Sequence, residues 1–488
     1  MSDKAAAATE HTTPALSHEE IARIVLGLML ALFLAAVDQT LISMSLLSMG
    51  RDLGGLDLMP WVMSGYLVAS TIATPIYGKL SDLYGRWPVM ASALILYFVA
   101  SLLCSISQSM PQLIACRVLQ GISGGALIGL VQASIADVAP GAQRGRYQGY
   151  MSGVFATASI MGPVIGGFIT EYLSWRAIFL INLPLGVLAF VLARRALARV
   201  PVSARVPRPI DFAGAVLLAG GLGTLMIGLT RLGQGVDWHA GSSLALFAGG
   251  VTLLALFAIR EQYAPDPLIP LSLLRNPVVL GSLAILFLVF FSLLGKTVLL
   301  PMWLQSLHGI GLDGVALRLL PYTLATPIGA AMAGKMMVLG VSMPRMMLAG
   351  LLGNSLAALA LALMQGDSAL LVSVVMIISG FCVGLALPTG LVIVQGTVLR
   401  TQLGVATATA ALSRTLGGAI GVALLTAILF ASLGVAGSGG AEMLREAVAS
   451  GQQSDSLASA FRLTFLVIAF TSAIGALIAL MMPRNAGR

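Results

Sequence analysis

Long apolar runs recur along almost the whole chain, and they constrain its fold more than any other feature. A helix needs about 20 mainly apolar residues to cross the hydrocarbon of a bilayer. Runs of this kind predict fourteen helices, over 21–46, 57–77, 88–107, 111–137, 148–170, 176–197, 211–230, 240–259, 277–303, 314–337, 343–364, 368–393, 402–434 and 458–482. We therefore expect an all-α membrane protein.

The composition favours a bilayer as the solvent. Of the 488 residues, 58% are hydrophobic and 9% are charged, whereas a soluble domain carries about 25% charged residues. The net charge of +8 does not indicate nucleic-acid binding, because membrane proteins gather Lys and Arg in cytoplasmic loops and no basic stripe with interleaved aromatics is present.

The cationic residues test the helix number independently. With the N-terminus inside, the predicted cytoplasmic segments hold 18 Lys and Arg residues and the external segments hold 6. This asymmetry follows the positive-inside rule. A miscount of one helix would reverse every later loop, so we expect a multi-pass protein of the plasma membrane (the bacterial inner membrane) with both termini in the cytoplasm.

An internal repeat divides the chain into two halves. Matched positions lie 251 to 257 residues apart: Gly153-Val154 with Gly404-Val405, Gly166-Gly167 with Gly417-Gly418, Gly78-Lys79 with Gly334-Lys335, and Thr40 with Thr297. Matched helices run in the same direction, which indicates two parallel six-helix bundles. We expect a cytoplasmic tail over 1–20, an N-terminal bundle over 21–197, a linker with two inserted helices over 198–260, a C-terminal bundle over 261–483 and a cytoplasmic end over 484–488.

Charged residues deep in apolar runs are candidate functional groups, because a charge at the bilayer centre costs about 2.5–3.5 kcal/mol even on the mildest scale. Asp38 and Arg117 lie at similar predicted depth. Desolvation favours the neutral form of a buried carboxyl and a nearby Arg favours the ionised form. The pair can therefore carry a proton, or it can be a static ion pair between two helices.

Two further cations, Lys296 and Arg414, are candidates for a substrate cavity, together with Gln39. Lys296 aligns with Gln39 through the repeat, and it can pair with Asp38, attract an anionic substrate, titrate, or extend to the outer interface. Arg414 lies too deep to reach the interface easily, so we expect it to contact the substrate or a counter-ion, or to be held by structural hydrogen bonds.

Two glycine-containing segments stand out. The segment from Gly78 to Arg86 is predicted to be a loop, in which Asp82 can bind a helix N-terminus and latch the two halves together. The alternative is an ordinary basic loop. In Gly162-Pro163-Val164-Ile165-Gly166-Gly167, proline bends a helix and glycine admits a neighbouring helix.

These residues together resemble the major facilitator superfamily, and specifically its fourteen-helix drug–proton antiporter branch. Gly78, Asp82, Gly85 and Arg86 fit the motif A pattern; Arg117-Val118-Leu119-Gln120-Gly121 is similar to motif B; and Gly162, Pro163, Gly166 and Gly167 fit the antiporter motif C. Asp38-Gln39-Thr40, Asn182-Leu183-Pro184 and Ser413-Arg414 are also similar to the branch.

The resemblance implies the major facilitator fold, in which two six-helix bundles, here with two extra central helices, alternate access to a cavity. It implies proton-coupled antiport and efflux of small amphipathic molecules, with Asp38 as proton carrier, Arg117 as its modulator, and Asp82 with Arg86 as the cytoplasmic gate. Ala158 and Val338 depart from the motif C and second motif A patterns. Acids in the later helices are missing, and Lys296 and Arg414 are present, so we hypothesise a neutral or anionic substrate.

Other functions have less support. Import of a vitamin or metabolite is an alternative, because the motifs do not fix the direction of transport. We expect neither an enzyme nor a non-transporting receptor, and no metal or cofactor beyond the proton gradient, since no nucleophile–base or metal-ligand set lies in the apolar runs. The sequence does not indicate whether a periplasmic adaptor binds.

Overall fold

The computed structural model describes residues 18–42, 45–55, 58–139, 141–198, 211–233, 241–265, 267–308, 312–364, 369–399, 402–433 and 454–483. Every regular element among them is helical. The helices are α1 (His18–Leu41), α2 (Leu46–Leu53), α3 (Met59–Tyr84), α4 (Arg86–Ser105), α5 (Met110–Val138), α6 (Gly141–Tyr172), α7 (Trp175–Leu197), α8 (Phe212–Gly233), α9 (Gly241–Tyr263), α10 (Leu271–Arg275), α11 (Pro277–His308), α12 (Leu312–Val338), α13 (Met343–Leu363), α14 (Ala369–Thr397), α15 (Leu403–Ser432) and α17 (Ser454–Met481). The predicted end at 484–488 and most of the tail over 1–20 lie outside the described residues.

Each of the fourteen predicted apolar segments overlaps one long helix. Eleven helices in the described part are long and apolar enough to cross a membrane, and α3, α6 and α12 are not among these eleven. The prediction of one helix over 21–46 is wrong at its end, because α1 stops at Leu41 and the short α2 follows.

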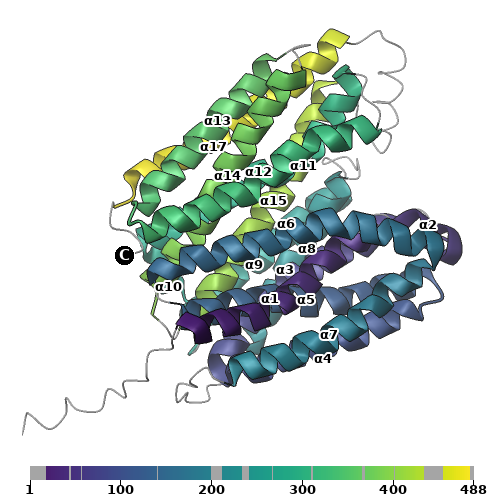
Figure 1. The fold of residues 1–488 in the computed structure, drawn as a ribbon, viewed down its shortest axis with the longest axis vertical. Coiled ribbons are helices and arrows are strands. Elements are labelled where there is room, and N and C mark those ends of the chain that lie inside the picture. The colour runs from purple at the N-terminus through teal and green to yellow at the C-terminus, as the bar shows by residue number, and fades with distance from the viewer. Residues whose placement is uncertain are drawn as a thin grey trace, which may run out of the picture.

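The helices form two bundles with the same internal packing (Figure 1). In the N-terminal bundle, α1 packs against α5, α6 and α7, α4 packs against α5 and α7, and α3 packs against α5. In the C-terminal bundle, α11 packs against α14, α15 and α17, α13 packs against α14 and α17, and α12 packs against α14. Helices matched by the repeat therefore occupy corresponding places.

The bundles meet along two seams, α6 with α12 and α3 with α15. Figure 1 shows them close together at the end that holds α10 and the start of α1, and apart toward α2. We refer to the close end as the predicted cytoplasmic face, because the start of α1 and α10 belong to segments predicted to be cytoplasmic.

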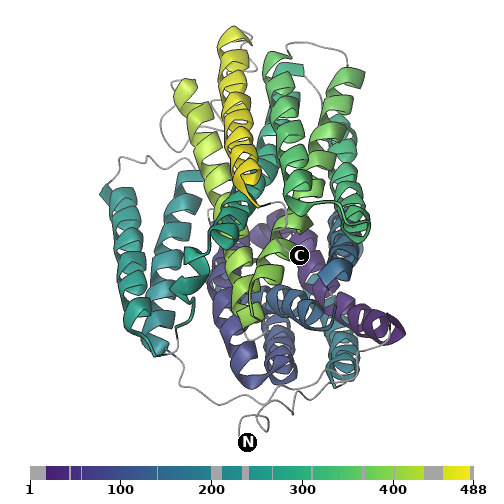
Figure 2. The same ribbon diagram turned by 90° about the vertical axis from the view of Figure 1, so that its left-hand side faces the viewer.

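The pair α8–α9 packs beside both bundles (Figure 2). Helix α8 contacts α3 and α15, the two helices of one seam. Buried Leu218 and Leu222 of α8 share an apolar cluster with Ile72 of α3 and Leu412 of α15. The inserted pair therefore covers this seam from the side.

Candidate functional site

Asp38 lies at the centre of a buried polar network in the N-terminal bundle. Its carboxylate is 0% exposed. Oδ2 accepts a hydrogen bond from Nη1 of Arg117 at 2.6 Å, and Oδ1 accepts bonds from Nε2 of Gln120 at 3.1 Å and Nδ2 of Asn182 at 2.9 Å. Because all three neighbours donate, the arrangement is that of an ionised carboxylate, which can only accept.

Arg117 is held from several sides. Its guanidinium stacks 4.3 Å from the centroid of the Tyr66 ring and donates to the carbonyl oxygen of Val62 at 3.3 Å and to Oε1 of Gln120 at 2.6 Å. These contacts fix the cation on α5 between α1 and α3. Because these contacts do not involve Asp38, they can hold Arg117 in place when the carboxyl becomes neutral and α1 moves.

Asn182 carries an unused acceptor beside Asp38. Its Oδ1 is buried without a hydrogen-bond partner, while its Nδ2 donates to Asp38 and, at 3.5 Å, to Oγ of Ser101. A protonated carboxyl has an O–H that must donate. If the amide of Asn182 turns over, its oxygen can accept that bond, so the site has hydrogen-bond partners for both protonation states of Asp38.

Asp82 joins the two bundles at the predicted cytoplasmic face. Its carboxylate accepts hydrogen bonds from the backbone amides of Gly404 and Val405 at 3.1 and 2.9 Å, which are free donors of the first turn of α15. Arg86 forms ion pairs with Asp82 at 2.8 Å and with Asp137 of α5 at 2.6 Å. The anion is thereby placed between its own bundle and a helix of the other one.

In the segment from Gly78 to Arg86, one glycine permits close helix packing and another permits a turn. The predicted loop from Gly78 to Arg86 is wrong, because α3 continues to Tyr84 and α4 begins at Arg86. Within the segment from Gly78 to Arg86, only Gly85 has a positive φ, at 96°. A Cβ at Gly78 would lie 2.6 Å from Cβ of Ala408 and 2.9 Å from the carbonyl oxygen of Gly404, so Gly78 lets α3 touch α15.

The glycines of 162–167 bring α6 against α1. A Cβ on Gly162 would overlap the side chain of Thr40, and one on Gly166 would lie 3.2 Å from Cα of Leu41. Thr40 Oγ1 also donates to the carbonyl oxygen of Ala158 at 3.0 Å. Gly167 faces open space, and Pro163 lies within α6. Helix contact is thus a property of two of these glycines.

Lys296 lies inside the C-terminal bundle. It is 0% exposed, so it does not extend to the outer interface. Its Nζ donates to Oδ1 of Asn354 and, at 2.5 Å, to Oγ of Ser379. Its described partners therefore belong to its own bundle, and the structure does not bring it to Asp38.

Arg414 lies between the bundles. From α15 of the C-terminal bundle it donates to Oε1 of Gln132 on α5 at 2.9 Å, and its guanidinium lies 5.5 Å from the ring centroid of Phe290 on α11. The described residues give it no carboxylate partner. Gln39 is partly buried on α1. Thr297, which the repeat matches with Thr40, is exposed on α11.

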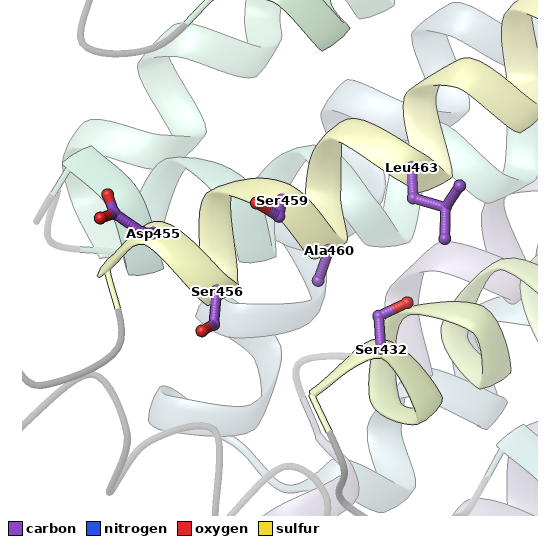
Figure 3. A pocket seen from close by; sticks show the side chains of 6 residues that line it. All are labelled: Ser432, Asp455, Ser456, Ser459, Ala460 and Leu463. Atoms are coloured by element: carbon purple, nitrogen blue, oxygen red, sulfur yellow. The ribbon is translucent and has the colours of Figure 1, made fainter.

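A cavity of about 440 Å³ lies elsewhere, between the end of α15 and the start of α17. Figure 3 shows its lining by Ser432, Asp455, Ser456, Ser459, Ala460 and Leu463. None of the site residues predicted from the sequence lines it. Within the described segments, no group of three or more His, Cys, Asp or Glu side chains could hold a metal ion.

Comparisons with known proteins identify relatives of this chain. Residues 28–422 match the family model of the Major Facilitator Superfamily. Multidrug transporter protein MdtP of Bacillus subtilis (strain 168) is 31% identical over 412 residues, 84% of this chain and 76% of that protein. Multidrug resistance protein 3 of the same organism is 33% identical over 362 residues, 74% of this chain and 70% of that protein.

Solved structures share the fold. The human organic anion transporter MFSD10 (TETRAN) superposes with a TM-score of 0.65 at 18% identity, covering 94% of this chain and 99% of that one. The proton:xylose symporter XylE gives a TM-score of 0.64 at 16% identity, covering 96% and 97% of the two chains.

Proposed function

Since the chain belongs to the major facilitator superfamily and is a membrane transporter rather than an enzyme, we propose that it exports small amphipathic molecules in exchange for protons. One observation carries the proton coupling: a fully buried carboxylate, Asp38, has three side-chain donors and a spare acceptor around it. The two named Bacillus subtilis relatives support efflux.

Protonation of Asp38 changes the forces in the N-terminal bundle. The ionised carboxylate attracts Arg117, and in a medium of low dielectric constant this attraction is strong. A neutral carboxyl loses it and turns to Asn182 for a hydrogen bond. Helix α1 can then move against α5, which links a proton to a rearrangement of the bundle.

Alternating access requires that the closed face open. The hydrogen bonds that the first turn of α15 donates to Asp82 exist only while the bundles touch at the predicted cytoplasmic face. We assign the gate to Asp82, Arg86 and the close contact at Gly78. When the gate opens, water replaces the backbone amides as the partner of Asp82.

The substrate contact is best placed at Arg414. This cation lies between the bundles, pairs with a neutral amide and touches an aromatic ring. An anionic or hydrogen-bond-accepting substrate can displace Gln132, and Phe290 offers an apolar surface. A neutral or anionic amphipathic molecule fits this chemistry better than a cation does.

We also propose the membrane arrangement. The fourteen long helices cross the bacterial plasma membrane, with both termini in the cytoplasm, and α8–α9 are the inserted pair between two six-helix domains. The eleven described helices that are long and apolar enough to cross a membrane support this arrangement, as does the excess of Lys and Arg in the predicted cytoplasmic segments.

The test is transport in everted vesicles with an imposed pH gradient, acid inside, across a panel of anionic, neutral and cationic fluorescent dyes. We expect proton-driven uptake of at least one dye by the wild type and its loss in Asp38→Asn. Asp52→Asn is the matched control, because Asp52 is an acid outside the buried network with a half-exposed side chain. Undiminished proton-driven uptake by Asp38→Asn would reject Asp38 as the carrier, and uptake that needs the reverse gradient would indicate an importer.

A further inference from the structure

A second buried polar cluster lies in the C-terminal bundle around Lys296. Asn354 is its centre: Oδ1 accepts from Lys296 and from Oγ of Ser379, the latter at 3.0 Å. Nδ2 of Asn354 donates to Ser292 at 3.0 Å and Ser472 at 2.8 Å. All five side chains are at most 2% exposed.

This cluster occupies the same place in its bundle as the Asp38 network does in the other. The Asp38 network draws on α1, α4, α5 and α7, through Asp38, Ser101, Gln120 and Asn182. The Lys296 cluster draws on α11, α13, α14 and α17. These are the corresponding helices of the repeat, so each bundle encloses one ionisable group on its first helix.

The surroundings of Lys296 hold no compensating anion in the described part of the chain. From α12, the Tyr322 ring lies 5.7 Å from Nζ, and from α14 the Cys382 thiol is near enough to interact electrostatically. Arg414 of α15 donates to the other bundle. Helices α13 and α17 contribute the neutral Asn354 and Ser472. A buried, unpaired ammonium is unfavourable unless it can lose its proton.

The cluster can hold either form of the amine. In the structure, the ammonium donates to Asn354 and Ser379. When it is neutral, Nζ has a lone pair, and the Ser379 hydroxyl can rotate away from Asn354 to donate to it. Asn354 and Ser379 can therefore bind the amine in either protonation state.

We propose that Lys296 is a second proton-binding group of the transport cycle, in the bundle opposite Asp38. In the step we assign to it, the N–H bond of the ammonium breaks, the proton passes to water admitted when the bundle rearranges, and the electron pair stays on Nζ. The reverse step recharges it. This inference rests on the proposed proton-coupled transport, and it raises by one the number of protons moved in each cycle.

A direct test follows the amine itself. The chain has four lysines, Lys4, Lys79, Lys296 and Lys335, so ¹⁵N-lysine labelling of the protein in nanodiscs gives few Nζ signals, and Lys296→Met identifies the relevant one by its loss. We expect that signal to change from the ammonium to the amine position within about pH 5 to 10. An ammonium signal throughout that range would overturn the proposal. The Lys296 signal should also change from ammonium to amine in the Asp38→Asn variant. This test of Lys296 therefore does not depend on the role of Asp38.

Transport of the dye identified by the vesicle panel provides the second measurement. Lys296→Arg keeps a permanent charge, and Lys296→Met has none, so both should export with one proton fewer per dye than the wild type. The stoichiometry comes from the dye gradient that balances a known pH gradient in proteoliposomes. An unchanged stoichiometry in both variants would reject Lys296 as a proton carrier, whereas loss of coupling only in Asp38→Asn would leave the proposed function standing.

Discussion

At the scale of single residues, the ion pair of Asp38 and Arg117 is out of contact with water, with side chains 0% and 1% exposed. Removing one partner of a buried pair leaves an uncompensated charge and costs about 3–5 kcal/mol. We therefore expect Arg117→Met to lower the unfolding free energy by that amount, and Asp38→Asn/Arg117→Met to recover most of it.

Denaturation of the three proteins in mixed micelles measures this difference. The double variant is the control for the loss of packing around Arg117, since it lacks both charges. A double variant as unstable as Arg117→Met would show that the guanidinium contributes through Tyr66 and Val62 rather than through Asp38.

Asp52 gives a pH dependence outside the membrane-spanning segments. The hydrogen bond from Arg176, followed by the one from Trp175 Nε1 at 3.0 Å, lowers the pKa of Asp52 below its ordinary value. A lowered folded-state pKa means that the stabilisation is present above the unfolded-state pKa, near about 4, and is lost as the pH falls below it.

The short helix α2, which ends one residue beyond Asp52, should therefore loosen in acid. We expect the fluorescence of Trp175 to change as the pH falls below about 4, and the change to be absent in Asp52→Asn. The difference spectrum between wild type and Trp175→Phe isolates this indole. An identical acid transition in Asp52→Asn would contradict the assignment.

Residues of this kind differ in how far the sequence reveals them. Charges in apolar runs are rare enough that Asp38, Arg117 and Lys296 are conspicuous. Gln120 and Asn182, which bind Asp38, were not predicted as site residues, although both lie in motifs that the sequence analysis quotes. Neutral polar side chains are common in membrane helices, and only the packing of four helices shows which of them meet.

At the scale of helices, the contact of α3 with α15 depends on the absence of a side chain at Gly78. Gly78→Ala places a Cβ 2.6 Å from Ala408, and overpacking of this kind costs about 1–3 kcal/mol. Helices can relieve it by separating, so we expect this variant to favour the open predicted cytoplasmic face.

Gly153→Ala is the matched control, since it has the same helix-propensity change in α6 with no heavy atom within 4 Å. Spin labels at the ends of α3 and α15 measure the separation by double electron–electron resonance. We expect longer distances for Gly78→Ala only. Equal distributions in both variants would show that this contact does not limit closure.

The sequence predicts where most helices lie but not where they end. The predicted helix over 57–77 stops at the polar residues that follow, whereas α3 continues through Asp82 to Tyr84. Charged residues end an apolar run, but they do not end a helix when partners exist. The partners of Asp82 are Arg86 and the first turn of α15. The two amides of that turn lie 322 and 323 residues away in sequence.

At the scale of the whole molecule, Arg414 is the cation that connects the bundles where we place the substrate. Arg414→Gln removes the charge and keeps polar character. A hydrogen bond to a charged group contributes about 1.5–3 kcal/mol, so we expect dissociation constants for an exported anionic dye to rise by about 10- to 150-fold.

Fluorescence titration of purified protein with anionic and neutral exported dyes checks this prediction. Arg414→Lys is the control that retains the charge and should lose less. Equal weakening for an anionic and a neutral dye would indicate that Arg414 holds the bundles together and does not recognise charge.

The internal repeat predicted two bundles of parallel direction, and the structure shows the same helix pairs packed in each. The state of the molecule was beyond the reach of the sequence. Which face is closed depends on contacts between bundles, such as Asp82 with α15, and the same residues must also permit the opposite state.

The second seam has a consequence for leakage. At the contact of α6 with α12, a Cβ on Gly145 would lie 3.2 Å from Cα of Gly334, and one on Gly149 would lie 3.3 Å from Cα of Ala331. Backbone pressed against backbone leaves no width for a file of water molecules, and protons travel along such files. We therefore expect the glycines to close this seam to ions in this conformation, so that ions do not bypass the proposed exchange of cargo for protons.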